Sequence, residues 1–223
     1  KELIELSAYV GVTGVKVKPN ALHKEISAEK TLEQIGKSLN ELAAYAAEFN
    51  QQIRLEVHGE ATQELPNIKK IMDWATHPNA AICWNCNPQD LNGQGFEHNF
   101  NLVKDRFGAT CHVRELDRTD YPYGALLANL AKMNYNGWVL LECHTNPENK
   151  VKEMKTQREV FDRMIARIKI IQNTIKEKQL PLLVHDLGCG EFIDRHPEQF
   201  QRRIAQEFAG SALGVKDVAA GIP

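Results

Sequence analysis

The sequence predicts an α/β protein built on a parallel β-sheet, and three observations lead to this prediction. Five short apolar runs alternate with segments whose apolar residues recur at helical spacing, and the connections between them are short. The apolar runs are continuous, as expected of parallel strands that are buried on both faces. Each run also ends in two polar residues spaced two apart. Alternation of strands and helices favours a parallel sheet covered by helices.

The first strand is expected within residues 11–19 and is closed by Pro19. A helix should follow, opened by a capping box of Thr31 and Gln34, in which each side chain bonds a backbone amide of the first turn. The second strand is QIRLEVHG, which Gly59 terminates.

The later elements continue the alternation. In chain order we expect a helix near 67–77, a strand at 79–85, a helix at 97–107, a strand at 108–115, a helix at 123–135, a strand at 138–144 and a long helix at roughly 149–177. A further short strand at 180–192 and a helix at 196–209 do not fit this repeat. We therefore divide the chain into a partial α/β unit over 1–178 and a C-terminal extension of uncertain fold over 179–223.

The composition is that of an ordinary soluble protein: 43% of its 223 residues are hydrophobic and 25% are charged. The net charge of -2 gives no reason to expect a nucleic-acid or membrane partner. No apolar run approaches the ~20 residues of a membrane span. Five scattered cysteines suit a reduced compartment, so we expect a cytoplasmic protein. The absence of a signal peptide is weak evidence, because the chain starts at Lys1 without Met.

Polar residues gather at the C-terminal ends of the predicted strands. The pairs are Lys16 and Lys18, Glu56 and His58, Asn85 and Asn87, His112 and Arg114, and Glu142 and His144. Alternate residues of a strand share a face, so each pair can point to one side. In α/β folds, and especially in (β/α)8 barrels, this end of the sheet carries the active site. Inward polar groups are costly unless they bind something.

Three of these residues suit a metal site. Glu56, His112 and Glu142 are the carboxylate and imidazole ligands that a divalent ion such as Mn²⁺, Mg²⁺, Co²⁺ or Zn²⁺ takes. An ion with open positions can bind adjacent hydroxyl and carbonyl oxygens and stabilise an enediolate, while carboxylates on either side move the proton. Lys16 and Lys18 either neutralise these carboxylates or meet a sugar oxygen or phosphate.

A family resemblance fits this pattern. The ordered motifs LEVHGE, ICWNCNP, CHVRELDR and GWVLLE resemble the second half of xylose-isomerase-like TIM barrels, the sugar isomerase and epimerase superfamily, over about residues 3–170. The resemblance implies a (β/α)8 barrel of which only strands four to eight are present, the strand at 15–18 being the fourth. It further implies one divalent metal ion held by Glu56, Asn85, His112 and Glu142, with the two glutamates as the acid/base pair.

The resemblance also implies substrate contacts. HVRELDR fits the His-x-x-Glu-x-x-Arg pattern of the ketose 3-epimerase branch, in which the arginine, here Arg118, contacts substrate. His58 matches a Glu-x-His variant of other branches. The expected substrate-binding set is completed by Lys18, Asn87 and Arg114. One departure concerns the metal: the family has Asp where this chain has Asn85, and a neutral amide lowers the expected affinity.

Three functions stay open from the sequence. The leading one is a metal-dependent isomerase or epimerase of a small sugar, polyol or keto-acid, with no nucleic-acid or membrane partner and with room for a homo-oligomer. Asn85 favours a second, a non-catalytic barrel that binds a sugar or a partner. The third is an apurinic endonuclease-like metal hydrolase, which the net charge of -2 and the few histidines disfavour.

Overall fold

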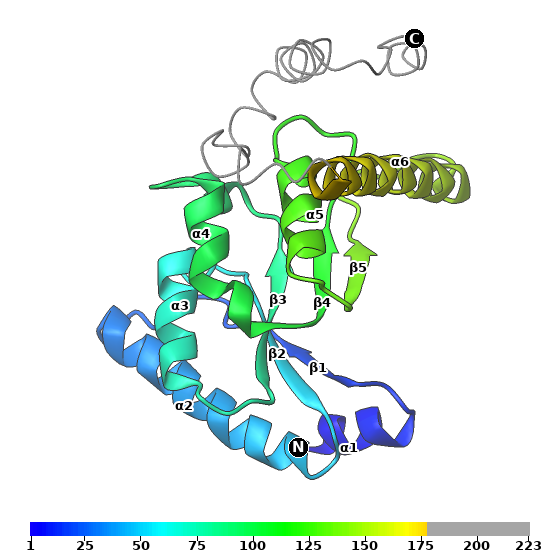
Figure 1. The fold of residues 1–223 in the computed structure, drawn as a ribbon. Helices are drawn as coiled ribbons and strands as arrows, with labels where there is room; N and C mark the ends of the chain where they lie inside the picture. Colours follow the sequence, from blue (N-terminus) through cyan, green and yellow to red (C-terminus); the bar gives the residue numbers. More distant parts are fainter. Residues whose placement is uncertain (178–223) are drawn as a thin grey trace, which may run out of the picture. The chain divides into compact units, whose positions relative to one another are not determined.

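The sheet of the computed structural model, which describes residues 1–177, has five parallel strands (Figure 1). In chain order they are β1 (Gly14–Val17), β2 (Gln52–Glu56), β3 (Ala80–Asn85), β4 (Phe107–Val113) and β5 (Trp138–Leu141). Their spatial order is the same as their order in the chain, β1-β2-β3-β4-β5. Each strand therefore reaches its parallel neighbour by a crossover connection. The result is a half-barrel, which confirms the predicted fold class.

The helices predicted between the strands are present, and their bounds differ by a few residues from those predicted. They are α1 (Glu2–Tyr9), α2 (Ala28–Ala47), α3 (Leu65–Trp74), the 3₁₀ turns η1 (Pro88–Leu91) and η2 (Lys104–Arg106), α4 (Phe96–Val103), α5 (Tyr123–Lys132) and α6 (Lys150–Glu177). None of these described helices is long and apolar enough to cross a membrane. The strand and helix predicted at 180–192 and 196–209 lie outside the described residues.

The chain forms two compact units. Among the described residues, the first comprises Lys1–Tyr121 and Tyr135–Gln157, and the second comprises Pro122–Asn134 and residues 158–177. All five strands belong to the first unit, whereas α5 and most of α6 belong to the second. The polar residues at the strand ends therefore lie within one unit.

The start of α2 corrects the predicted capping box. The helix begins at Ala28, and the cap is Ser27, whose hydroxyl accepts a hydrogen bond from the amide of Lys30 at 3.3 Å. Thr31 lies inside the first turn and donates its hydroxyl to the carbonyl of Ser27 at 3.2 Å. Serine is at least as good a cap as threonine, and the earlier start lets Thr31 and Leu32 be buried.

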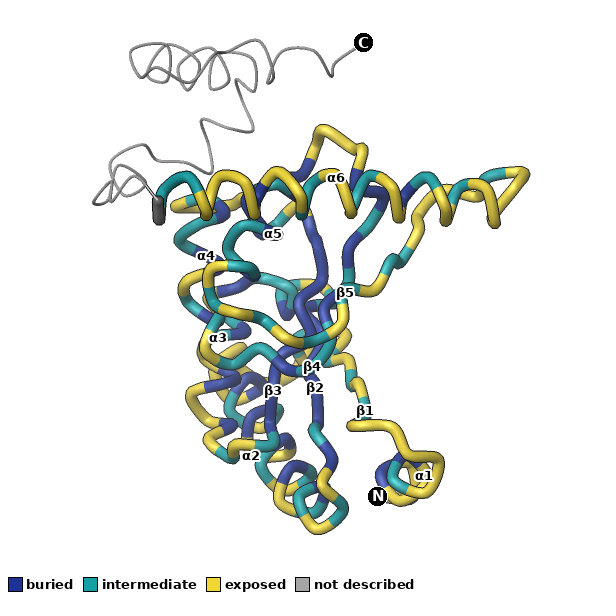
Figure 2. The backbone as a smooth tube through the Cα atoms, turned by 45° about the vertical axis from the view of Figure 1, so that its right-hand side comes forward, coloured by how far each residue is buried: buried dark blue, intermediate teal, exposed yellow. Residues whose placement is uncertain are grey.

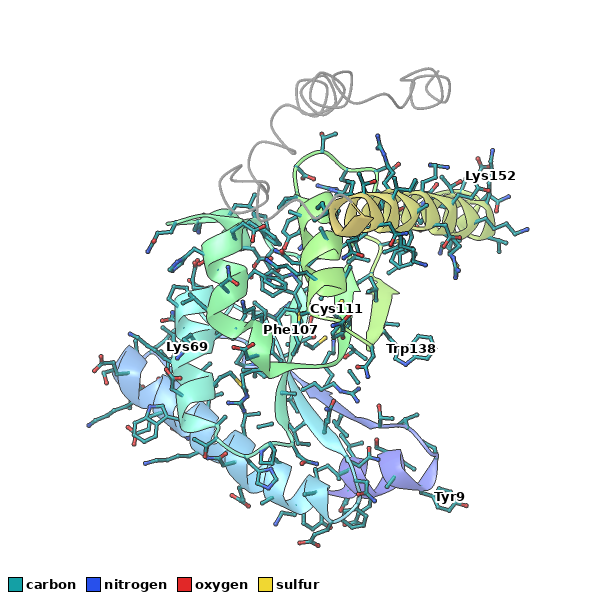
Figure 3. The ribbon with its side chains drawn as sticks, in the orientation of Figure 1. Tyr9, Lys69, Phe107, Cys111, Trp138 and Lys152 are labelled. Atoms are coloured by element: carbon teal, nitrogen blue, oxygen red, sulfur yellow. The ribbon has the colours of Figure 1, made fainter. Side chains whose placement is uncertain are left out.

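The core of the first unit lies between the sheet and the three helices α2, α3 and α4, which stack along one side of it (Figure 1). The central strand β3 is buried at every position, and the dark blue of β2 and β3 in Figure 2 marks this core. Trp84 anchors it through ring contacts with Phe96, Phe100 and Phe107, at centroid distances of 5.5 to 6.0 Å. Trp138, at the start of the edge strand β5, is instead 72% exposed and projects away from the sheet (Figure 3).

Candidate metal and substrate site

The candidate site lies at the C-terminal ends of the parallel strands. Glu56 is the last residue of β2 and Asn85 the last of β3. The register between β3 and β4 shifts between Ile82 and Trp84, after which Asn85 pairs with His112. Glu142 follows β5 directly, and its amide continues the ladder by donating to the carbonyl of Val113 at 2.8 Å. The polar residues predicted at the strand ends therefore lie together at the C-terminal end of the sheet.

Three of these side chains converge. Glu56, His112 and Glu142 each offer one ligand atom, and these atoms lie within 4.8 Å of one another. His112 Nδ1 is 3.9 Å from Glu56 Oε1 and 3.6 Å from Glu142 Oε2. It is buried and has no hydrogen-bond partner within the described chain. Two carboxylates and an imidazole around one point fit a divalent cation, and a ligand bond would satisfy the buried nitrogen.

Burial also sets the protonation of His112. It lowers the pKa of the imidazole, and the charges of Lys16 and Lys18 lower it further against the opposing effect of Glu142 and Glu56. A ring whose pKa lies below its usual 6.5 is mostly neutral at pH 7. Neutral imidazole is the form that binds metal.

Two lysines of the β1 end contact Glu56. Lys16 forms an ion pair with Glu56 Oε2, and Lys18 Nζ lies 3.8 Å from Glu56 Oε1. Glu56 is 0% exposed, so an unpaired charge there would be costly. Both lysines therefore offset the charge of the carboxylate.

Asn85 and Asn87 are buried beside the carboxylates. The Nδ2 atom of Asn85 lies 3.5 Å from Glu56 Oε1, which puts a neutral amide next to the cluster. Asn87 is held in place, because its Nδ2 donates to the carbonyls of Val57 at 2.7 Å and Asn85 at 3.0 Å. Asn87 is thus a rigid amide group at the end of β3.

A cavity of about 360 Å³ opens beside the cluster. It is lined by Lys18, His58, Gln63, Asn85, Asn87, Arg114, Glu142, Cys143 and His144. The sequence patterns did not indicate two of these residues. Cys143 falls between the two positions of the polar pair Glu142 and His144, and Gln63 lies in a loop without any motif. Arg118 is outside this lining and pairs with Asp120, with Nε 2.9 Å from Oδ1. Its predicted contact with substrate stays a prediction.

Glu115, the glutamate of the His-x-x-Glu-x-x-Arg pattern, fixes the loop after β5. Its Oε1 accepts hydrogen bonds from the amides of His144 at 2.9 Å and Thr145 at 2.7 Å, and from the Thr145 hydroxyl at 2.7 Å. Burial alone would raise the pKa of Glu115, but these bonds lower it to about 2. Glu115 therefore positions His144 at the cavity rather than exchanging protons.

Solved structures with the same fold include three enzymes. They are the 3-keto-D-glucoside 4-epimerase of E. coli (15% identity, TM-score 0.58, covering 74% of this chain and 68% of that one), the D-psicose 3-epimerase of Clostridium cellulolyticum H10 (17%, 0.53, 75% and 64%) and a probable 3-DHS dehydratase of Bacillus anthracis (14%, 0.51, 72% and 67%). The chain thus spans about two thirds of their lengths. At such identities the likeness shows the fold alone.

The sequence itself carries the family signal. A search of curated proteins found no match. A family model described as xylose isomerase-like TIM barrel matches residues 1–164, which include all five strands and every residue of the cavity. The chain belongs to the xylose isomerase-like TIM barrel family, as the motifs at its strand ends predicted.

Proposed function

We propose that this protein is a metal-dependent isomerase or epimerase of a small sugar, polyol or keto-acid. The observation that carries the proposal is the convergence of Glu56, His112 and Glu142 within 4.8 Å beside a cavity. Two of the similar structures, a 3-keto-D-glucoside 4-epimerase and a D-psicose 3-epimerase, are epimerases of sugars and support the reaction class. The cavity volume of about 360 Å³ also suits a small molecule.

In this proposal Glu56, His112 and Glu142 hold a divalent ion, with Asn85 as a neutral fourth group. When bound, the ion supplies positive charge that stabilises negative charge on a substrate oxygen. Glu142 lines the cavity and its side chain is 42% exposed, so it can take a proton from a carbon next to a carbonyl. Glu56 is the second member of the acid/base pair: after it takes a proton from the neighbouring Lys16 or Lys18 ammonium it can donate that proton to the carbon, while Glu142 keeps the one it removed.

A second candidate function is non-catalytic binding of a sugar or partner. It is favoured by Asn85, which contributes no charge, and by the lysines that already offset Glu56. In that case the fold and the cavity would be intact but the metal affinity would be low.

The two functions are separated by metal content and proton exchange. The wild type is compared with a Glu56→Gln, Glu142→Gln double variant, with the exposed Glu60→Gln as the matched control. We expect about one equivalent of Mn²⁺, Mg²⁺, Co²⁺ or Zn²⁺ per chain in wild type and control, and loss of it in the double variant. We also expect NMR to detect deuterium incorporation from D₂O into ketoses or keto-acids. A folded wild type that takes up no metal after dialysis against Mn²⁺ would favour the binding function.

A further inference from the structure

Arg114 lines the cavity without a direct acidic partner. Its Nε atom is buried and makes no hydrogen bond within the described chain. Two nearby carboxylates form no ion pair with Arg114 in the described chain. The Oδ2 atom of Asp90 accepts hydrogen bonds from the Asn87 amide and the Tyr121 hydroxyl while its Oδ1 is buried without a partner there, and Asp120 pairs with Arg118. A half-buried guanidinium in this state needs an acceptor from outside the chain segment described.

His58 carries a second unsatisfied atom in the same cavity. Its Nδ1 is buried and, in the part of the chain that the structure describes, has no hydrogen-bond partner. Its backbone is fixed, because its carbonyl accepts a bond from the Thr62 hydroxyl at 2.8 Å. His58 follows β2 and Arg114 follows β4, so the two groups approach the cavity from separate strand ends.

The charge of the residues that line the cavity also favours an anionic ligand. Lys18 and Arg114 are basic side chains, whereas Glu142 is the one carboxylate among the nine lining residues. The buried Glu56 contacts both Lys16 and Lys18, so these two lysines and Arg114 outnumber the carboxylates Glu56 and Glu142 by one charge. A bound divalent ion would add further positive charge. A neutral sugar would leave this excess uncompensated, and an anion would neutralise it.

We propose that the small molecule bound in this cavity carries an oxyanion group, a carboxylate or a phosphate, and that Arg114 binds that group together with His58 and Lys18. The planar guanidinium fork matches both groups through paired hydrogen bonds. This proposal rests on the proposed function for its site and names the class of substrate. It predicts that acidic sugars, sugar phosphates and keto-acids bind more tightly than neutral ketoses and polyols.

A matched series of three-carbon probes tests the proposal: glycerol, D-glycerate and glycerol 3-phosphate. Binding of each to the full chain is measured by calorimetry, once with Mn²⁺ and once after EDTA treatment. We expect at least one anionic probe to bind about tenfold or more tightly than glycerol in both conditions. The tighter of the two anions identifies carboxylate or phosphate. Equal affinities for all three probes, or no binding of any, would overturn the proposal.

Variants assign the preference to Arg114. Arg114→Gln should remove most of it and Arg114→Lys should retain part, because lysine keeps the charge but loses the fork. The exposed Arg158→Gln, which also removes one positive charge, should change nothing. Equal losses in Arg114→Gln and Arg158→Gln would overturn the proposal, as would a preference that needs Mn²⁺ and survives Arg114→Gln. Because the EDTA arm requires no metal, failure of the metal proposal does not decide this one.

Discussion

Asn85 sets the charge of the candidate metal site. It is buried at the end of β3, opposite His112 in the sheet register, with its amide 3.5 Å from Glu56. The family resemblance implies Asp here, and an amide offers an oxygen ligand without charge. If the proposed metal binds here, the amide in place of a carboxylate should weaken its binding.

Asn85→Asp should therefore tighten Mn²⁺ binding by about tenfold or more, because it adds a ligand charge. Without metal, the new carboxylate would lie beside Glu56 and lower the free energy of unfolding by about 1–3 kcal/mol. Calorimetry and urea denaturation with and without EDTA check both effects. The exposed Asn92→Asp adds the same charge away from the site and serves as control. Unchanged Mn²⁺ affinity in Asn85→Asp would contradict a metal ligand at this position.

Asp90, a buried residue of η1, makes the free energy of unfolding depend on pH. Burial raises the pKa of Asp90 to about 8, although hydrogen bonds from Tyr121 and Asn87 oppose the shift. A pKa that is higher in the folded state than the ordinary 3.8 adds stability at low pH, and that stability is lost as pH rises to about 8. We expect the free energy of unfolding to fall as the pH rises from about 4 to about 8, and to fall less in Asp90→Asn. Urea denaturation at several pH values measures it, with the exposed Asp73→Asn as control; identical slopes would contradict the assignment.

At the scale of elements, α2 and α3 pack unusually closely. A Cβ atom at Gly36 would lie 2.4 Å from the Cβ of Trp74 and 2.6 Å from the carbonyl oxygen of Ile71. Asn40 of α2 closes the end of α3 by donating to the Trp74 carbonyl at 2.6 Å and accepting from the His77 amide at 2.8 Å. This contact joins α2 to α3, and α2 also packs on β2 and β3, whose ends carry Glu56 and Asn85.

Gly36→Ala should lower the free energy of unfolding by about 1–3 kcal/mol, because the methyl group forces the helices apart. The intrinsic preference of helices for alanine over glycine, about 1 kcal/mol, acts in the opposite direction. Ser38→Ala, on the exposed side of the same helix, should be neutral or slightly stabilising. Thermal and urea denaturation compare the two; a Gly36→Ala protein as stable as wild type would show that the helices have room to shift.

At the largest scale, the sheet formed by the described residues has two outer strands, β1 and β5. On β5, Trp138 is 72% and Leu140 is 40% exposed, so this edge is apolar. An exposed apolar edge strand is a template for pairing with another chain. The sequence leaves a homo-oligomer open, and strand pairing at β5 is one way in which it could form.

We expect concentration-dependent self-association in analytical ultracentrifugation, weakened by Trp138→Glu, which places a charge on this edge. Tyr9→Glu is the matched control, since Tyr9 is 88% exposed on α1, away from β5 (Figure 3). A monomer at every concentration, or equal effects of the two substitutions, would contradict association through β5.

Local patterns in the sequence determined the α/β class, the order of the elements and the strand ends that carry Glu56, Asn85, His112 and Glu142. These features follow from apolar periodicity and from the alternation of side chains along a strand, which depend only on neighbouring residues. The family motifs lie in those same strand ends, so the family was also predictable.

Contacts between distant segments decided the rest. The register shift before Asn85, the pairing of Lys16 with Glu56, the entry of Gln63 into the cavity and the role of Glu115 all join segments that no local pattern relates. The sequence offers two hydroxyl residues, Ser27 and Thr31, that could cap α2. Ser27 is the cap in the structure, where Thr31 is buried. Side-chain spacing determines which way a residue points, but only packing determines what it meets there.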